Sequence, residues 1–456
     1  MQLSTLFAPG PGRLLLVAGS LAMFALGASQ ALYGPFFPYF SDTLGVTPSR
    51  LGLLPGLHFA GATIGVLGGG FAARRWGYRW LLRVGGAVLT AGYLAAAIAG
   101  TWSALLVGVA FLGLGFGLLV NFNILVDEAF GAVGAAALQL INATFSIGAI
   151  SAPLLAVASL QIGGQGLAFG IGGAVAAMLT ALLFFGHDSA DRMVAAQRAV
   201  VASAAAERAV AERADGVAAG GADGLPVGAA NGGPGGTSVA SASVSSARVD
   251  AVSESASESA STRAGAANAS RAHQRALLVP IALFLPLYLI YPGAEASFSN
   301  WMPTHLFSLL PVAVASAVAS GFWLMFTVGR LIAVPLSVRL RPGTMVGVAV
   351  VLAGAAALTA TVDAAAPVAY LVAGLALGPI FPGGLSWLRR RYPARAGEVA
   401  SIIIAAGGIG GMLIPPALGV VVERWGAGAV PVALTAVLTL AILLTALIGV
   451  SGRRRA

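Results

Sequence analysis

Long apolar runs separated by short polar gaps dominate this chain. Each run has about the 20 residues that an α-helix needs to cross the hydrocarbon core of a membrane. The first six runs fall at about 14–40, 50–72, 80–99, 103–125, 133–159 and 165–186. The second six fall at about 277–300, 313–338, 343–362, 366–388, 398–422 and 427–450. The pattern predicts an all-α membrane protein with twelve spanning helices.

A polar stretch of different composition separates the two sets. Residues 187–275 repeat Ala, Ser and Gly and hold eight Arg and nine Asp or Glu. Such a segment cannot bury enough apolar area to offset the entropy lost on ordering. We therefore expect a six-helix bundle over 1–186, a disordered linker over 187–275 that is helical between about 188 and 215, and a second six-helix bundle over 276–456.

Composition supports a membrane protein and excludes several soluble classes. Of the 456 residues, 58% are hydrophobic and 9% charged, whereas a soluble domain has about 25% charged residues. This balance argues against a soluble enzyme, a secreted module or a nucleic-acid-binding protein. The chain has no cysteine, so disulfides and thiolate metal sites are excluded. The first apolar run continues to about Phe40 and is long enough to be a retained helix rather than a signal peptide.

The distribution of arginine predicts the orientation. All 25 basic residues are Arg, and they gather in alternate gaps between the apolar runs. With both termini inside, the outer loops hold only Arg50 and Arg424. The short cytoplasmic segments then hold fourteen arginines: Arg13, Arg74, Arg75, Arg79, Arg83, Arg339, Arg341, Arg389, Arg390, Arg391, Arg395, Arg453, Arg454 and Arg455. The positive-inside rule therefore predicts that both termini and the linker lie in the cytoplasm. We expect the chain to span the inner, cytoplasmic membrane of the cell.

The two sets of six runs resemble each other. Gly113-Leu-Gly-Phe-Gly in the fourth run corresponds to Gly374-Leu-Ala-Leu-Gly in the tenth, and Ile147-Gly-Ala-Ile-Ser-Ala-Pro in the fifth corresponds to Ile409-Gly-Gly-Met-Leu-Ile-Pro in the eleventh. The offsets are 261 and 262 residues. Repeats with the same orientation predict two bundles related by an axis along the membrane normal, with a cavity between them at mid-membrane.

The loop after the second run carries a recognisable motif. It reads Gly70-Phe-Ala-Ala-Arg74-Arg75-Trp-Gly77-Tyr-Arg79. This resembles the major facilitator superfamily signature G-x-x-x-D-R-x-G-R-R, with Arg74 where the acidic residue usually stands. Gly77 permits a tight turn, and the arginines suit helix C-terminal carbonyls and lipid headgroups. Plain positive-inside charge is the alternative reading of this loop.

Four further stretches resemble the fucose permease group of that superfamily. They are Leu138–Ala149, Tyr291–Trp301, Gly321–Arg330 and Gly378–Pro382. The resemblance implies the major facilitator fold, a sugar as solute, and coupling carboxylates within the first and fourth spans. This chain has Gln30 in the first span and Asn121 and Asn123 in the fourth instead. Coupling through the fourth span is therefore in doubt, which leaves a proton on Glu295, a sodium ion or facilitated diffusion.

Ionisable side chains away from the ends of predicted spans, where charge is costly and usually functional, include Glu295, Arg330 and His58. Glu295, beside Pro292 and Gly293, is a candidate for binding a sugar hydroxyl or carrying a proton, with a structural hydrogen bond as the alternative. Arg330, toward the cytoplasmic end of the eighth span, suits a helix cap, a gate ion pair or an anionic solute. His58 in the second span suits either packing or a proton relay.

Uncharged polar and aromatic side chains complete the candidate sites. Amides suit a polyhydroxy ligand and aromatic faces suit its C–H surface, with helix-to-helix hydrogen bonding as the alternative. The predicted solute-binding set is Gln30, Asn121, Asn123, Gln139, Asn142, Glu295, Asn300, Trp301 and Trp323, with Tyr33 and Phe145 as further aromatic faces. The predicted cytoplasmic gate is Gly70, Arg74, Arg75, Gly77, Arg79, Asp127, Glu128 and Arg330.

We therefore expect a secondary transporter, active or facilitative, that moves a small polar solute by alternating access, with a sugar as the leading class. Drug or metabolite efflux and a transporter-like sensor are the alternatives. The four His are scattered and the chain has no Lys for an ATP-binding loop, so neither an enzyme nor an ATP-driven pump is indicated. We expect a monomer whose partners are the solute, the bilayer and a coupling proton or sodium ion, with no nucleic acid, cofactor or metal.

Overall fold

The structure is a computed structural model that describes residues 11–185, 199, 203, 207, 278–393 and 396–453. The chain divides into two units, Met1–Gln197 with Pro280–Ala456, and Arg198–Val279. Ala199, Ser203 and Glu207 are helical. The rest of the predicted linker, including most of the expected helical stretch over 188–215, lies outside the described residues. Every regular element in the described ranges is helical.

The first half of the chain forms the helices of the first predicted bundle. They are α1 (Pro11–Ala31), α2 (Tyr33–Leu44), α3 (Pro48–Leu51), α4 (Leu53–Ala97), α5 (Trp102–Val120), α6 (Phe122–Phe130), η2 (Gly131–Val133), α7 (Gly134–Ile162) and α8 (Gly166–Phe185). The predicted first span over 14–40 is thus two helices, which break at Leu32. Pro35 explains the break, because it lacks the N–H that would bond to the carbonyl of Ala31.

The second half forms a corresponding set. It contains the helix Leu278–Leu309, here called helix 278–309. It continues with α11 (Val312–Arg339), α12 (Pro342–Thr359), η3 (Asp363–Ala365), α13 (Ala366–Leu377), α14 (Ile380–Arg391), α15 (Ala396–Trp425), η5 (Ala427–Ala429) and α16 (Val430–Arg453). Helix 278–309 extends nine residues beyond the predicted end at 300, because Asn300 and His305 are buried rather than exposed.

The number of crossings agrees with the prediction. Eleven helices in the described ranges are long and apolar enough to cross a membrane, and one of them, Pro48–Ala97, has 50 residues. Gly77 interrupts it with φ 83° and ψ 160°, a conformation that glycine adopts without steric cost. The two parts on either side of Gly77 are each long enough to span. The described residues therefore provide twelve crossings, as the apolar pattern predicts.

Glycine allows the helices within each half to pack closely. A side chain at Gly117 of α5 would overlap the Ala62 carbonyl of α4, and one at Gly410 of α15 would overlap the Leu289 carbonyl of helix 278–309. Gly68 of α4 differs, because no neighbouring atom lies within 4 Å of a side chain built there. Small residues permit this backbone-to-backbone approach between membrane helices.

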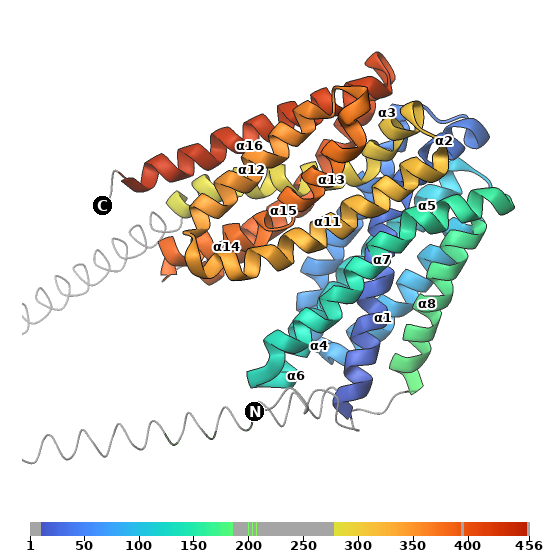
Figure 1. The fold of residues 1–456 in the computed structure, drawn as a ribbon. Helices are drawn as coiled ribbons and strands as arrows, with labels where there is room; N and C mark the ends of the chain where they lie inside the picture. The colour runs from blue at the N-terminus through green and yellow to red at the C-terminus, as the bar shows by residue number, and fades with distance from the viewer. Residues whose placement is uncertain are drawn as a thin grey trace, which may run out of the picture. The chain divides into compact units, whose positions relative to one another are not determined.

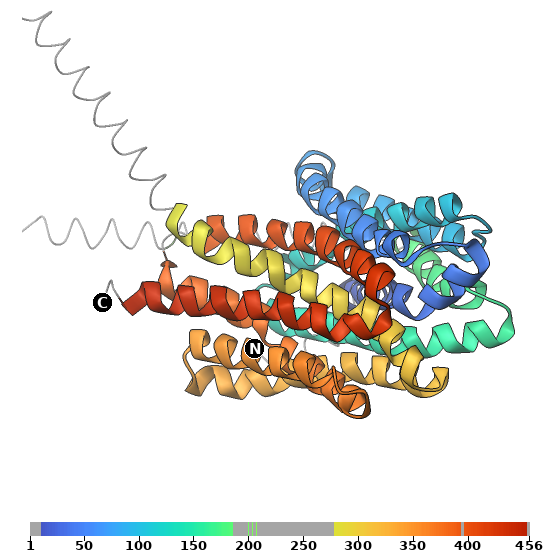
Figure 2. The ribbon, with the colours of Figure 1, turned by 90° about the horizontal axis from the view of Figure 1, so that it is seen from above.

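The two halves contact each other through several pairs of helices within the larger unit. α3 and α4 pack against α15, and α7 packs against α11, as Figure 1 shows for α7 and α11. Gly34 of α2 also lies against the backbone of Asn300 in helix 278–309. Helix 278–309, drawn yellow in Figure 2, runs beside α15.

Candidate functional site

An intramembrane carboxylate stands at the centre of the candidate site. Glu295 lies near the middle of helix 278–309 and is half-buried. Tyr291, one helical turn earlier, donates its hydroxyl to Oε2 of Glu295 at 2.7 Å and also approaches the carbonyl of Leu377 in α13 at 3.0 Å. A hydrogen bond to an ionised acceptor is stronger than a neutral one. Tyr291 therefore fixes the orientation of the carboxylate.

Two further polar groups reach Glu295 from other helices. Gln30 in α1 is buried and interacts with the carboxylate. Arg330 in α11 interacts with it electrostatically. These four side chains, Gln30, Tyr291, Glu295 and Arg330, are called the Glu295 cluster below. The cluster joins the two halves of the chain, because Gln30 belongs to the first half and the other three to the second.

The guanidinium of Arg330 is directed inward. Its Nε donates to the carbonyl of Gly378 at 3.3 Å, and its Cζ lies 4.4 Å from the centre of the Phe326 ring. Arg330 precedes the end of α11 at Arg339 by nine residues, or about 13 Å at 1.5 Å per residue. Its charge also acts electrostatically on Glu295, and its place in the predicted cytoplasmic gate stays a prediction. Within a membrane, a cation so placed suits an ion partner or a polar ligand.

The predicted amides fall into separate groups. Nδ2 of Asn142 in α7 donates to Oδ1 of Asn123 in α6 at 2.8 Å, so these two form a pair between helices. Asn121 is buried and donates to the carbonyls of Gly117 and Leu118 in its own chain segment. Gln139 is exposed. Among the described residues, Gln30 is the predicted amide that interacts with Glu295.

Asn300 and Trp301 make structural contacts one to two turns beyond Glu295. The indole N–H of Trp301 donates to the carbonyl of Pro415 in α15 at 2.8 Å, and its ring lies edge-on to Phe37, 4.8 Å between centroids. Asn300 donates to the carbonyl of Ala296, while its Oδ1 is buried with no hydrogen-bond partner. Trp301 thus ties helix 278–309 to α15 and to the first half.

Trp323 brings the aromatic faces of the two halves together. It is buried in α11, and its ring lies 6.5 Å from that of Phe145 in α7, edge to face. It also packs on Phe326, the ring beneath Arg330, at 5.4 Å. Two of the predicted aromatic faces, Phe145 and Trp323, therefore meet at the contact between halves, next to Arg330 of the Glu295 cluster.

His58 is enclosed within the first half. Its Nδ1 lies 2.9 Å from the hydroxyl of Tyr33, its ring packs edge-on against Phe116 at 5.1 Å, and its Nε2 is buried without a hydrogen-bond partner. These contacts fit the packing alternative. The relay role of His58 stays a prediction.

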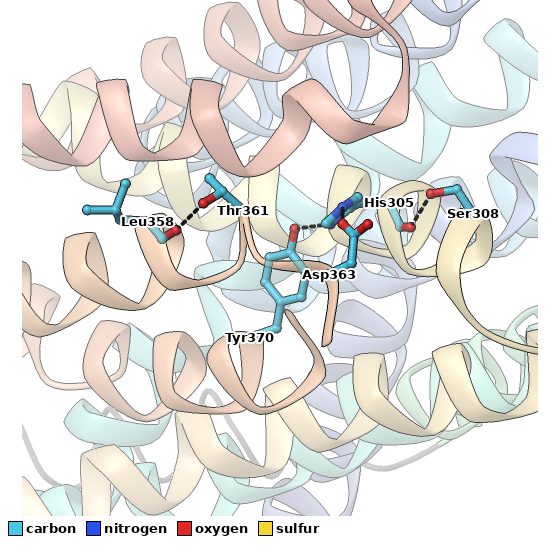
Figure 3. A network of polar contacts seen from close by, with 6 residues as sticks. All are labelled: His305, Ser308, Leu358, Thr361, Asp363 and Tyr370. Carbon is cyan, nitrogen blue, oxygen red and sulfur yellow. Dashed lines mark hydrogen bonds and ion pairs between the residues drawn. The ribbon is translucent and has the colours of Figure 1, made fainter. Parts of the chain in front are cut away.

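A matching histidine and tyrosine pair, which no pattern in the sequence distinguishes, occurs in the second half (Figure 3). Nδ1 of His305 lies 2.8 Å from the hydroxyl of Tyr370, and its Nε2 lies 4.0 Å from a carboxylate oxygen of Asp363. Asp363 is exposed, whereas His305 is buried. In each half, therefore, a histidine and a tyrosine from different helices satisfy each other inside the bundle.

The motif over 70–79 has the turn that its glycine predicts. The positive φ of Gly77 breaks α4 there, and Arg74, Arg75 and Arg79 are exposed. Gly70 faces open space. Asp127 is exposed on α6 and Glu128 is half-buried. Pairing of these two acids with the arginines across a gate stays a prediction.

Glycines bring the two halves close together along the first part of α4. Gly52, just before α4, and Gly56 lie against Pro415, Pro416 and Met412 of α15, and Gly408 and Gly411 of α15 lie against the side chains of Thr63 and Phe59 of α4. We call these contacts the glycine seam. Nearby, the Ser49 backbone N–H donates to Oε2 of Glu423 at 2.9 Å. The two halves are thus closed at the end that carries few arginines.

Comparison with known proteins identifies the family. The model of the Major Facilitator Superfamily matches residues 19–309, well over half of the chain. The chain belongs to the Major Facilitator Superfamily. It is accordingly a multi-pass membrane protein of a transporter family.

In the described ranges, no group of three or more His, Cys, Asp or Glu is placed to hold a metal ion.

Relatives in this superfamily differ in the solutes that their names give. The probable nitrate/nitrite transporter NarK2 of Mycobacterium tuberculosis is 33% identical over 141 residues, which cover 29% of this chain and 35% of NarK2. The chain thus spans about a third of the length of that relative. The human sodium-dependent glucose transporter 1 is 25% identical over 417 residues, covering 88% of this chain and 72% of the human protein.

Solved superfamily structures share the fold across nearly the whole chain. The xylose transporter XylE from E. coli aligns with a TM-score of 0.65 at 11% identity, covering 94% of this chain and 97% of XylE. A peptide transporter of the POT type aligns with a TM-score of 0.68 at 16% identity, covering 97% and 94%. At such identities the likeness concerns the fold alone.

Proposed function

We propose that this protein is a secondary transporter that moves a small polar solute, with a sugar as the leading class, by alternating access. The observation that carries the proposal is the Glu295 cluster, in which a carboxylate, an amide, a phenol and a guanidinium meet within the membrane between the two halves. Charged groups at such depth are costly to keep and generally serve a ligand or an ion. Binding between halves is also where a rocking transporter exposes its site to each side in turn.

A sugar suits the chemistry of this cluster. Carboxylate and amide oxygens accept hydrogen bonds from hydroxyls, and the guanidinium and amide nitrogens donate to them. The rings of Phe145 and Trp323 add apolar faces at the same contact between halves. Similarity over 88% of this chain to a sodium-dependent glucose transporter agrees with this choice.

A small inorganic anion is the second candidate solute. Arg330 supplies an intramembrane positive charge, and NarK2 is the relative with the higher identity. The adjacent Glu295 carboxylate disfavours a free anion unless it is protonated or displaced from Arg330. The sugar is therefore preferred.

Glu295 is the proposed coupling group. A carboxylate shared by Tyr291, Gln30 and Arg330 can change its partners when a proton or sodium ion binds. Arg330 also provides a counter-charge that keeps the site neutral while the carboxylate is ionised. We propose that solute and ion share this cluster and that neither His58 nor the fourth span takes part.

Orientation and state follow from the distribution of charge. We propose that the arginine-rich ends face the cytoplasm of the inner membrane, with both termini and the linker on that side. The glycine seam then closes the external side, and the site is approached from the cytoplasm. Opening of the seam would give the opposite state.

Transport into proteoliposomes tests the proposal. The purified full-length chain is reconstituted, and uptake of a labelled hexose, nitrate and a lipophilic drug is compared with and without a proton or sodium gradient. We expect gradient-driven hexose uptake that Glu295→Gln abolishes and that Asp42→Asn, at an exposed carboxylate in α2, leaves intact. Nitrate or drug transport in place of hexose would change the solute class, and absence of all transport would favour a sensor.

A further inference from the structure

A cavity of about 1010 Å³ lies in the second half, formed by helices that do not contribute to the Glu295 cluster. Its walls come from α12, α14 and α16. Figure 1 shows these helices beside one another, with the arginine-bearing end of α14 near the C-terminal end of α16. None of its lining residues belongs to the Glu295 cluster or to the glycine seam. The proposed binding and transport of the solute therefore do not explain this cavity.

Arginines gather at one end of this cavity. Arg341, Arg390 and Arg391 line it, and no Asp or Glu does. Arg391 is engaged in the structure, since its guanidinium donates to the carbonyl of Ile448 and, at 3.1 Å, to the hydroxyl of Ser451. Arg341 and Arg390 are exposed. Among the described interactions neither has an ion pair or a hydrogen-bond partner for its guanidinium, so both are available to an anion.

The start of α12 adds to this positive end. Arg341 caps the helix without a side-chain hydrogen bond to it, and Pro342 is the first helical residue. Gly343 and Thr344 follow and line the cavity. Backbone N–H groups in the first turn of a helix have no intrahelical acceptor and favour a negative charge. They add to the attraction that the arginines exert.

The other end of the cavity is apolar and leads into the membrane. Val351 and Ile442 line it, and Val351 lies ten residues beyond Arg341, or about 15 Å at 1.5 Å per residue. Trp387 stands between the two ends, with its indole against Gly343. Tryptophan at such a boundary is typical of the level of lipid headgroups. A ligand that fills the cavity is therefore charged at one end and apolar over the rest.

We propose that this cavity binds an anionic phospholipid of the cytoplasmic leaflet. The phosphodiester lies between Arg341 and Arg390, and an acyl chain lies along Val351 and Ile442. Basic pockets between spanning helices on the cytoplasmic side suit such headgroups. A zwitterionic lipid is less suitable, because the cavity offers no carboxylate to its amine. The site goes beyond the proposed transport, and only its assignment to the cytoplasmic leaflet rests on the proposed orientation.

Lipid retention by the purified full-length protein tests the site. The chain in detergent is mixed with phosphatidylglycerol or phosphatidylcholine, and bound lipid is counted by native mass spectrometry. We expect phosphatidylglycerol to be retained in preference to phosphatidylcholine. The double variant Arg341→Gln/Arg390→Gln should bind phosphatidylglycerol about 30-fold more weakly, since each arginine near the headgroups contributes a factor of about five to the affinity. The matched control Arg339→Gln removes a neighbouring charge from α11, outside the cavity, and should bind as the wild type does.

A second variant distinguishes binding of a whole lipid from binding of a free phosphate. Val351→Trp fills the apolar end without changing any charge; Val351 is 51% exposed, so the fold should tolerate the larger side chain. We expect Val351→Trp to lower the retention of phosphatidylglycerol, and we expect glycerol phosphate to compete poorly with the lipid for the wild-type cavity.

Three outcomes would each overturn the proposal: equal retention of both lipids, an equal loss of binding in Arg339→Gln, or full retention of phosphatidylglycerol in Val351→Trp. Unchanged melting temperatures in the same detergent confirm that the variants fold, and a cavity variant that unfolds is replaced by Arg341→Gln alone.

Discussion

The side chain of Thr63 on α4 meets Gly408 of α15 at the glycine seam. A Cβ built on Gly408 would lie 3.4 Å from the Cβ of Thr63, with the Thr63 hydroxyl directed at it. This separation is close to the 3.5–4.5 Å that a disulfide spans between its two Cβ atoms. The chain has no native cysteine, so a pair introduced here has no competing thiol.

We expect Thr63→Cys/Gly408→Cys to form a disulfide on oxidation and to hold the seam closed. Solute uptake should fall to background in oxidised proteoliposomes and return when a reductant is added, because opening of the seam is part of each cycle. Thr63→Cys alone is the control. Full uptake by completely cross-linked protein would show that transport does not require the seam to open.

Tyr291→Phe tests whether the orientation of Glu295 matters. The variant removes the hydroxyl that donates to Oε2, and a hydrogen bond to a charged group contributes about 1.5–3 kcal/mol. We expect uptake to fall by about tenfold, with an altered pH dependence. The matched control is Tyr288→Phe, one turn earlier, whose hydroxyl donates to the Phe381 carbonyl instead. Equal effects of both variants on the pH profile would contradict a specific role for Tyr291.

The twelve spans and the break at Gly77 could be predicted from the sequence, because both depend on local composition: spanning length from apolar runs, and a turn from glycine. The breaks at Leu32 and between α13 and α14 at Gly378 are hidden in the hydropathy pattern, because apolar character continues through them. Pro35 was an available signal for the first of these breaks. The end of helix 278–309 was placed too early because buried Asn300 and His305 look like loop residues in sequence.

The candidate site was only partly predictable. Glu295 and Gln30 stood out as polar groups in apolar runs, but their contact depends on how two helices pack across the halves. Tyr291 was missed, although its position one turn before Glu295 was an available signal. The inward direction of Arg330 depends on the Phe326 ring and the Gly378 carbonyl, which no spacing rule reveals.

Trp301→Phe should destabilise the protein. Trp301 is fully buried, and the variant leaves a small cavity and an unpaired Pro415 carbonyl, which together cost about 2–4 kcal/mol. The melting temperature in detergent, followed by light scattering or intrinsic fluorescence, reports the loss. Trp425→Phe, at a residue 67% exposed at the end of α15, is the control and should change little. A Trp301→Phe protein that melts with the wild type would show that this contact is dispensable.

Alanine substitutions at two glycines of α4 distinguish the effect of close helix packing on stability from the effect of helix propensity. A methyl group at Gly65 would lie 2.5 Å from the Leu114 carbonyl oxygen of α5, whereas one at Gly68 would meet nothing within 4 Å. We expect Gly65→Ala to destabilise by about 1–3 kcal/mol through overpacking. Gly68→Ala should be neutral or stabilising by up to about 1 kcal/mol, since alanine favours a helix. Thermal unfolding of the two variants in one detergent checks both, and the reverse order would refute the packing argument.

The glycines at the seam also decide what the parted surfaces present to solvent. Gly52 and Gly56 face the carbonyl oxygens of Pro415 and Met412 instead of interlocking with bulky apolar side chains. When the helices separate, water can therefore hydrate exposed peptide oxygens along the opening. At these glycines the opened wall is polar, so the transition between states exposes little apolar surface there to water.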